Sequence, residues 1–314
     1  MSKKKDILIL VLKCVVSFSL LGFILCFKIP LKDIKNVIIS ADIGWILVSF
    51  SLHSLGLLIS AVRWKILITA QDDDASLLFL LKSYLVGSFF NNLLPTRIGG
   101  DAVRIWDGSK LSRSMLKSLA IVLVERLTGI LILLFFALGA AAFRIETAKN
   151  SPVIWVALIL GGAGIAFILF FFSPLTVSIL RFLPDKKILV KIKQKAISLR
   201  ETVLSYRRKK KELARAMFWA LLLQINVILH FFLIGKALKL SIGIVDYFIF
   251  IPLVLLIQLI PVTINGLGLR EGAYLEIFSS YGIAGETAIA FSFIDLAFML
   301  IVGIIGGIIY VTRK

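Results

Sequence analysis

Long apolar runs alternate with short polar connections along the whole chain. About 20 consecutive apolar residues are enough to cross a bilayer as a helix. The runs that meet this length cover residues 7–27, 43–62, 118–143, 152–173, 216–238 and 284–310. The pattern predicts an all-α fold, a polytopic bundle of membrane helices with about six full spans.

Two further apolar runs, 76–94 and 245–262, each lead into a break rich in proline and glycine. The first break reads LLPTRIGGDAVR and the second reads IPVTINGLGLREG. Both contain the pattern P-x2-I-x-G-x3-R, from Pro95 to Arg104 and from Pro261 to Arg270. Broken helices at corresponding positions of two halves are typical of transporters built from inverted repeats. A chance match between two breaks of similar composition is the alternative interpretation.

Composition supports a single transmembrane domain over residues 1–314. Hydrophobic residues make up 59% of the chain, charged residues only 17%, and the mean hydropathy is +0.99. A soluble domain has about 25% charged residues. The first apolar run is too long for a signal peptide and Lys13 interrupts it, so we expect a retained helix.

The net charge of +18 is explained by membrane topology rather than by nucleic-acid binding. The segment 174–215 carries thirteen lysines and arginines against three acidic residues. Basic connections remain in the cytoplasm, so this segment fixes the orientation of the rest. This orientation places both termini in the cytoplasm, together with Arg63, Trp64 and Lys65. We expect the protein to lie in the inner membrane of the cell.

This orientation predicts two opposed re-entrant hairpins. Residues 76–117 start and end on the cytoplasmic side, and residues 245–283 start and end on the outer side. Each hairpin has its proline and glycine break at the tip. Such irregular backbone is tolerated at membrane depth only where protein or water surrounds it.

Charged residues in apolar surroundings are the candidates for substrate binding. A charge at bilayer depth costs at least about 2.5–3.5 kcal/mol. Charged residues are therefore expected there only where they are paired or bind a ligand. Arginine grips phosphate in a bidentate manner, and glycines allow a ligand to approach the backbone closely. We expect a site that binds an anion. Glu125 and Asp295 would take up protons or balance the positive charge of the site when it is empty. Its candidate residues are Arg97, Gly99, Gly100, Asp101, Arg104, Glu125, Arg126, Gly266, Gly268, Arg270, Glu271 and Asp295. Pairing of these charges with one another is the structural alternative.

Residues 188–206 have one apolar helical face opposite lysines. We expect this face on the inner leaflet, held by anionic lipid at about 1 kcal/mol per basic residue. The basic residues assigned to the membrane surface are Lys186, Lys187, Lys191, Lys195, Arg207 and Arg208. The two histidines, His53 and His230, are interpreted as hydrogen-bonded residues inside the bundle and not as a metal site.

Three motifs together resemble a known family. NNLLPTRIGGDAVR, VERLTG and PVTINGLGLREG are similar to the flippase-like membrane proteins grouped with the transmembrane region of lysylphosphatidylglycerol synthase. The resemblance covers nearly the whole chain. It implies a protein that moves a phospholipid or a polyprenyl-linked lipid between leaflets. No aminoacyltransferase domain follows the last span, so we expect no lysyl transfer.

No catalytic signature and no cofactor motif is found, so an enzyme is not predicted. Two alternatives to a flippase remain open. One is a membrane-embedded transferase that acts on a lipid carrier, with Asp101 or Glu125 as base. The other is a non-catalytic subunit that recruits envelope-synthesis enzymes through the basic segment. A homo-oligomer is compatible with each of the three.

Overall fold

The computed structural model describes residues 15–94, 98–143, 155, 159, 161–166, 173, 176, 187–258, 262–263 and 266–313. Within these residues the regular structure is helical, which confirms the predicted all-α class. The helices are η1 (Ile24–Lys28), α2 (Leu31–Ile39), α3 (Ile43–Thr69), α4 (Leu77–Leu93), α5 (Ile98–Ser112), α6 (Met115–Phe143), α10 (Lys187–Ser205), η2 (Tyr206–Arg208), α11 (Lys210–Ala237), α12 (Ile244–Ile257), α13 (Leu269–Ser279) and α14 (Gly285–Thr312).

Four described helices are long and apolar enough to cross a membrane: α3, α6, α11 and α14. They correspond to four of the six predicted spans. In the first predicted span, residues Val15–Cys26 bend by 82° into α2, so this pair counts as a fifth span only if it is taken as one broken helix. The predicted span 152–173 lies mostly outside the described residues. Over the described ranges the structure therefore supports four to five spans.

Helix α3 is longer than its apolar run indicated. It begins at Asp42, whose carboxylate accepts a hydrogen bond from the Gly44 amide at 2.8 Å, and it continues to Thr69. Arg63 and Trp64 are therefore helical and buried within the protein. The helix therefore does not end with the apolar run at residue 62, because the side chains of Arg63 and Trp64 meet polar and aromatic partners on α4, α5 and α6. The cytoplasmic side expected for these residues stays a prediction.

The two predicted hairpins contain pairs of short helices. The first pair is α4 and α5, with 17 and 15 residues, and the second is α12 and α13, with 14 and 11 residues. Each helix is shorter than the roughly 20 residues that a full span needs. The residues at the breaks, Pro95 to Arg97 and Pro261, lie outside the described residues. How deeply each pair enters the membrane stays a prediction.

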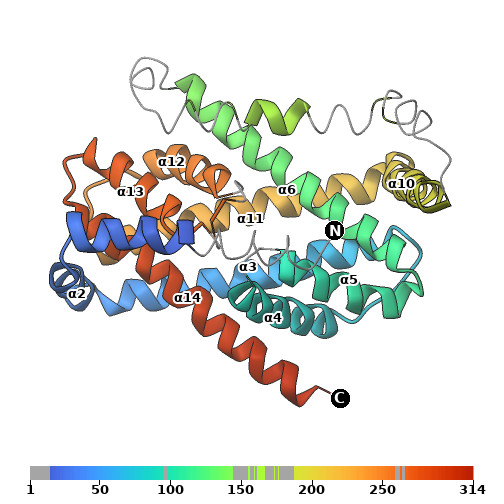
Figure 1. The fold of residues 1–314 in the computed structure, drawn as a ribbon, viewed down its shortest axis with the longest axis horizontal. Helices are drawn as coiled ribbons and strands as arrows, with labels where there is room; N and C mark the ends of the chain where they lie inside the picture. The colour runs from blue at the N-terminus through green and yellow to red at the C-terminus, as the bar shows by residue number, and fades with distance from the viewer. Residues whose placement is uncertain are drawn as a thin grey trace.

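Helix packing follows the same scheme in the two halves of the chain. When α3, α4, α5 and α6 are matched in order with α11, α12, α13 and α14, each packed pair in the first set has a counterpart in the second. Helices α3 and α11 pack extensively against each other, and α6 packs on α12 as α4 packs on α14. Figure 1 shows α6 and α12 on one side of the α3–α11 pair and α4 and α14 on the other. This correspondence supports the inverted repeat, which stays a prediction.

Glycines let several of these helices approach closely. A Cβ at Gly306 of α14 would lie 1.9 Å from the carbonyl oxygen of Leu85 on α4. A Cβ at Gly100 would lie 2.8 Å from the carbonyl oxygen of Gly87, so α5 also depends on glycine where it crosses α4. In a lipid environment such close backbone contact is a main source of helix association, because burial of apolar side chains adds little there.

The basic segment packs partly on protein. Lys195, Arg207 and Arg208 are exposed, as expected, whereas Lys186 and the side chains of Lys187 and Lys191 lie outside the described residues. The end of the apolar face, at Val203 and Tyr206, is buried in a cluster with α3, α4 and α6. The Tyr206 hydroxyl donates a hydrogen bond to the carbonyl oxygen of Leu67 at 2.7 Å. This end of the face therefore does not lie on the inner leaflet, because the bundle already covers it.

Candidate functional site

The candidate charged residues gather in two clusters, one within the first half of the chain and one that joins the second half to His53 of α3. The arginine cluster consists of Arg63, Tyr84, Asp101, Arg104, Glu125 and Arg126. The histidine cluster consists of His53, His230, Arg270, Glu271 and Asp295. Arg97, which was expected in the same site, lies outside the described residues.

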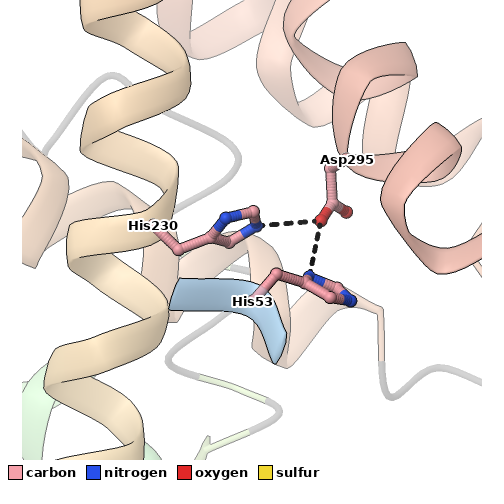
Figure 2. Close-up of side chains that lie close together, drawn as sticks. All are labelled: His53, His230 and Asp295. Carbon is pink, nitrogen blue, oxygen red and sulfur yellow. Dashed lines mark hydrogen bonds and ion pairs between the residues drawn. The ribbon is translucent and has the colours of Figure 1, made fainter. Parts of the chain in front are cut away.

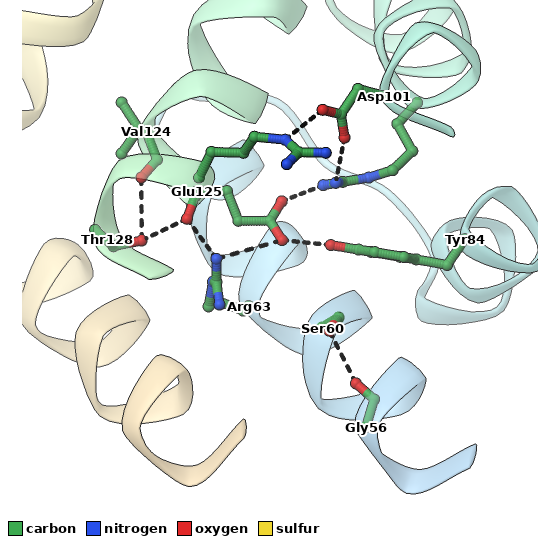
Figure 3. Close-up of polar contacts among 10 residues, drawn as sticks. Gly56, Ser60, Arg63, Tyr84, Asp101, Val124, Glu125 and Thr128 are labelled. Carbon is green, nitrogen blue, oxygen red and sulfur yellow. Dashed lines mark hydrogen bonds and ion pairs between the residues drawn. The ribbon is translucent and has the colours of Figure 1, made fainter. Parts of the chain in front are cut away.

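Glu125 is the centre of the arginine cluster (Figure 3). Its carboxylate accepts hydrogen bonds from Tyr84 and Arg104, and the Arg63 guanidinium lies 3.6 Å away. Arg63 also donates to the backbone carbonyl of Glu125. The side chain of Glu125 is only 5% exposed, so its charge is compensated by protein groups and not by solvent.

Aromatic rings hold Arg104 in place. The guanidinium carbon lies 4.5 Å from the ring centroid of Trp64 and 4.1 Å from that of Tyr84. A cation on the face of desolvated aromatic rings gains about 2 kcal/mol or more. Asp101 adds an ion pair at 3.5 Å, so Arg104 has partners on several sides within the arginine cluster.

Arg126 differs from the other arginines of this cluster. Its side chain is 43% exposed, against 6% for Arg63 and 7% for Arg104. Its Nε donates a hydrogen bond to Asp101. With both carboxylates ionised, three arginines face Asp101 and Glu125, so the arginine cluster has one excess positive charge.

The histidine cluster is built around Arg270, which is fully enclosed in the protein. Arg270 Nη2 lies 2.9 Å from Glu271 Oε1, and Arg270 Nη1 lies 3.2 Å from Asp295 Oδ2. The other oxygen of Asp295 lies 3.1 Å from His230 Nε2 and 3.9 Å from His53 Nδ1 (Figure 2). With neutral histidines, one arginine faces two carboxylates, so this cluster has one excess negative charge.

The clusters occupy corresponding places in the two halves. Glu125 lies ten residues after the start of α6, and Asp295 lies ten residues after the start of α14. Arg63 and His230 each lie twenty residues after the start of their helices, α3 and α11. Each carboxylate is thus met by a cationic or titratable side chain of the corresponding helix.

The expected glycines have packing roles in the structure. Gly99 and Gly100 are buried against Phe90, Leu94 and Gly87 at the crossing of α4 and α5. Gly266 and Gly268 have positive φ values of 79° and 83°, which glycine adopts without strain. The amide of Gly268 donates to Glu271 Oε2 at 2.6 Å. An approaching anion would therefore compete with a carboxylate for this amide.

A cavity of about 380 Å³, which we call the polar cavity after its charged and amide side chains, lies between residues of both clusters. The apolar part of its wall is formed by Val227, Phe231, Leu255, Met299 and Val302. Arg126 lines it from the arginine cluster, and His53, His230 and Asp295 line it from the histidine cluster. The other polar groups on its wall are Ser88, Asn91, Asn92 and Gln258. The volume is within the range of about 300–1,000 Å³ that is common for small-molecule sites.

Several of these residues were missed from the sequence. Arg63 was placed beyond the end of its apolar run, Tyr84 was not considered, and the histidines were treated as separate. The pair Asn91–Asn92 at the end of an apolar helix was the available signal for the cavity, because amides that lie in apolar surroundings usually have a hydrogen-bond partner. Asn92 Nδ2 donates to the Met299 carbonyl at 2.9 Å and so connects α4 to α14.

Comparisons with known proteins place the chain among membrane proteins. Residues 10–307 match the family model described as the lysylphosphatidylglycerol synthase TM region. A UPF0104 membrane protein of Pyrococcus horikoshii is 24% identical, and the match covers 89% of this chain and 90% of that protein. A UPF0104 membrane protein of Methanocaldococcus jannaschii is 26% identical over 90% of this chain and 88% of that protein. No solved structure matches the chain. The protein belongs to the family of the lysylphosphatidylglycerol synthase TM region, as its three motifs predicted.

Proposed function

We propose that the protein is a flippase that moves a phosphate-bearing lipid, or a lipid-linked envelope precursor, between the leaflets of the cell membrane. The observation that carries this proposal is the polar cavity, which Arg126 and the histidine cluster line together. The family supports a role connected with membrane lipids.

Arg126 is the residue that we assign to the lipid phosphate. Arg104 and Arg270 are buried, with exposed side-chain fractions of 7% and 2%, and carboxylates already hold them. Arg126 lines the cavity and is the most exposed arginine of a cluster with an excess positive charge. An arginine can bind two phosphate oxygens at once, and the interaction is strengthened where water is scarce.

Asp101 gives the site a way to release its lipid. It is paired with Arg126 in this structure, so an arriving phosphate must take the place of its carboxylate. When the phosphate leaves, Asp101 again neutralises the guanidinium. Binding and release are then an exchange between two anions, and neither state leaves a bare charge in the membrane interior.

Transport in proteoliposomes tests the proposal. Purified protein is reconstituted with a fluorescent phospholipid, and a membrane-impermeant quencher measures how fast the inner-leaflet lipid reaches the outside. We expect wild-type protein to accelerate the exchange and Arg126→Gln to abolish the acceleration. Lys110→Gln is the matched control, because Lys110 is 60% exposed and does not line the cavity. Equal rates for wild type and Arg126→Gln would overturn the assignment.

A further inference from the structure

Three metal-ligand side chains converge at one wall of the polar cavity. His53 is on α3, His230 on α11 and Asp295 on α14. One ligand atom of each lies within 4.8 Å of the others. Figure 2 shows both imidazole rings directed at the same carboxylate oxygen. We propose that His53 Nδ1, His230 Nε2 and Asp295 Oδ1 bind a divalent transition-metal ion of the zinc type, with its remaining coordination position open to the cavity.

The distances approach those of a tetrahedral ion. Zinc bonds to nitrogen and oxygen are about 2.0–2.2 Å long, so two ligand atoms of a tetrahedral site are roughly 3.3–3.5 Å apart. The Asp295 oxygen lies 3.1 Å from His230 Nε2 and 3.9 Å from His53 Nδ1, and all three ligand atoms lie within 4.8 Å of one another, so the side chains must draw together around an ion. Two histidines and one carboxylate with an open position form a common zinc ligand set.

Neighbouring groups orient the ligands as they do in metal sites. His230 Nδ1 lies 2.9 Å from the Ser49 hydroxyl oxygen and 3.2 Å from the Ser49 carbonyl oxygen. That hydroxyl is also within 2.9 Å of the His230 carbonyl, to which it donates. In the tautomer that carries its proton on Nδ1, the ring donates to Ser49 and the lone pair of Nε2 faces Asp295. Such a partner on the second ring nitrogen fixes the tautomer that binds a metal.

A neighbouring residue also orients the carboxylate of Asp295. Arg270 holds Oδ2 at 3.2 Å, which leaves Oδ1 directed at the histidines. In the tautomer with the proton on Nδ1, two lone pairs lie 3.1 Å apart, and a cation between them would remove the repulsion.

The histidine cluster taken alone lacks one positive charge, which a bound cation would supply. Arg270 is the single arginine against Glu271 and Asp295, and the side chains of these three residues are 2%, 0% and 10% exposed. Buried charges need compensation. A proton on one histidine would supply one positive charge and needs a single acceptor. Convergence of three ligand atoms from three helices favours a metal ion, since the third residue, His53, has no role in a two-residue proton site.

The open coordination position of the ion indicates which chemical group of the substrate it would bind. An ion at this wall and Arg126 line the same cavity, so a phosphate group would find a positive charge on both sides. This last step rests on the proposed function. The metal site itself does not.

Metal analysis of the purified full-length protein tests the site without any transport assay. The protein is stripped with a chelator, dialysed against zinc and measured by mass spectrometry of the metal. We expect one ion per chain in wild type, and a loss of affinity of about 100-fold or more in His53→Ala, because even residues behind a ligand contribute 10–100-fold. Lys110→Gln, outside the cavity, is the control that keeps the ion. No stoichiometric zinc in wild type, or equal uptake by His53→Ala, overturns the site and leaves a protonated histidine as the cation.

A replacement ligand separates coordination from a structural role. In a background with Cys14 and Cys26 changed to serine, His53→Cys supplies a thiolate in place of the imidazole. We expect it to restore binding and, with cobalt, to add a thiolate charge-transfer band to the visible spectrum. Failure to bind metal while the protein remains folded contradicts direct ligation by residue 53.

Transport after chelation separates this inference from the proposed function. Transport that is lost with the chelator and restored by zinc supports an ion that meets the lipid phosphate. Unchanged transport by stripped protein overturns that last step, while the metal site stands. Zinc binding that is retained by a protein without any flipping activity overturns the proposed function alone.

Discussion

Glu125 holds the arginine cluster together, so its neutral analogue should destabilise the fold strongly. Glu125→Gln keeps the shape of the side chain and removes its charge. Arg63, Arg104 and Arg126 would then face Asp101 alone, and the excess positive charge would rise from one to two.

The expected loss of stability follows from the burial of the arginines that pair with Glu125. Removing one member of a buried ion pair typically costs about 3–5 kcal/mol, because the other charge is left uncompensated. At roughly 2 °C per kcal/mol for a long chain, the melting temperature should fall by about 6–10 °C. Glu276→Gln, on the exposed side of α13, removes the same charge without a buried partner and should change the melting temperature very little.

Thermal unfolding in detergent, followed by intrinsic fluorescence, measures the difference. The double variant Arg104→Gln/Glu125→Gln adds a second criterion, because it removes a positive charge together with the negative one. Its cost should be smaller than the sum of the two single costs by about 0.5–3 kcal/mol. A melting temperature of Glu125→Gln equal to that of Glu276→Gln would refute the reasoning, and so would strict additivity in the double variant.

Three further changes test other parts of the structure. Tyr84→Phe removes a hydrogen bond to a charged group and should cost about 1.5–3 kcal/mol in the same unfolding assay, less than Glu125→Gln. Gly306→Ala should destabilise by about 1–3 kcal/mol, because its Cβ would lie 1.9 Å from a backbone oxygen, whereas Gly272→Ala has open space and should be neutral or stabilising. In a cysteine-free background, Lys110→Cys and Ser280→Cys should react with an impermeant maleimide from opposite sides of the membrane; reaction of both from one side would exclude opposed hairpins.

The sequence predicted the parts of the fold that depend on local composition. Apolar runs are long and unmistakable, so α3, α6, α11 and α14 were found, as were the two breaks that separate α4 from α5 and α12 from α13. The end of α3 was missed because a charged residue, Arg63, was interpreted as the end of an apolar span. Burial of that charge depends on Glu125, 62 residues away, and no local pattern contains this information.

The sequence identified many residues of the candidate site but not which of them pair with one another. Arg104, Glu125, Arg270 and Asp295 were selected because charges in apolar surroundings are costly. The structure pairs arginines with carboxylates, and it brings His230 to Asp295 across 65 residues. The packing of α3, α11 and α14 creates this contact, so two histidines that look isolated in the sequence belong to one cluster.

The order of the paired charges along the chain has a consequence for biogenesis. Arg63 on α3 and Arg104 on α5 are synthesised before Glu125 on α6, and Arg270 on α13 is synthesised before Asp295 on α14. In each half the arginine of the shorter helix enters the membrane together with a carboxylate of its own helix, Asp101 beside Arg104 and Glu271 beside Arg270. The last helix of each half therefore completes the cluster when it docks, since it adds the second carboxylate and the contacts that bury the arginine. A ribosome that stalls before α14 would leave Arg270 paired with Glu271 and without Asp295, and quality-control proteases would meet a half-finished protein with polar groups that no helix covers.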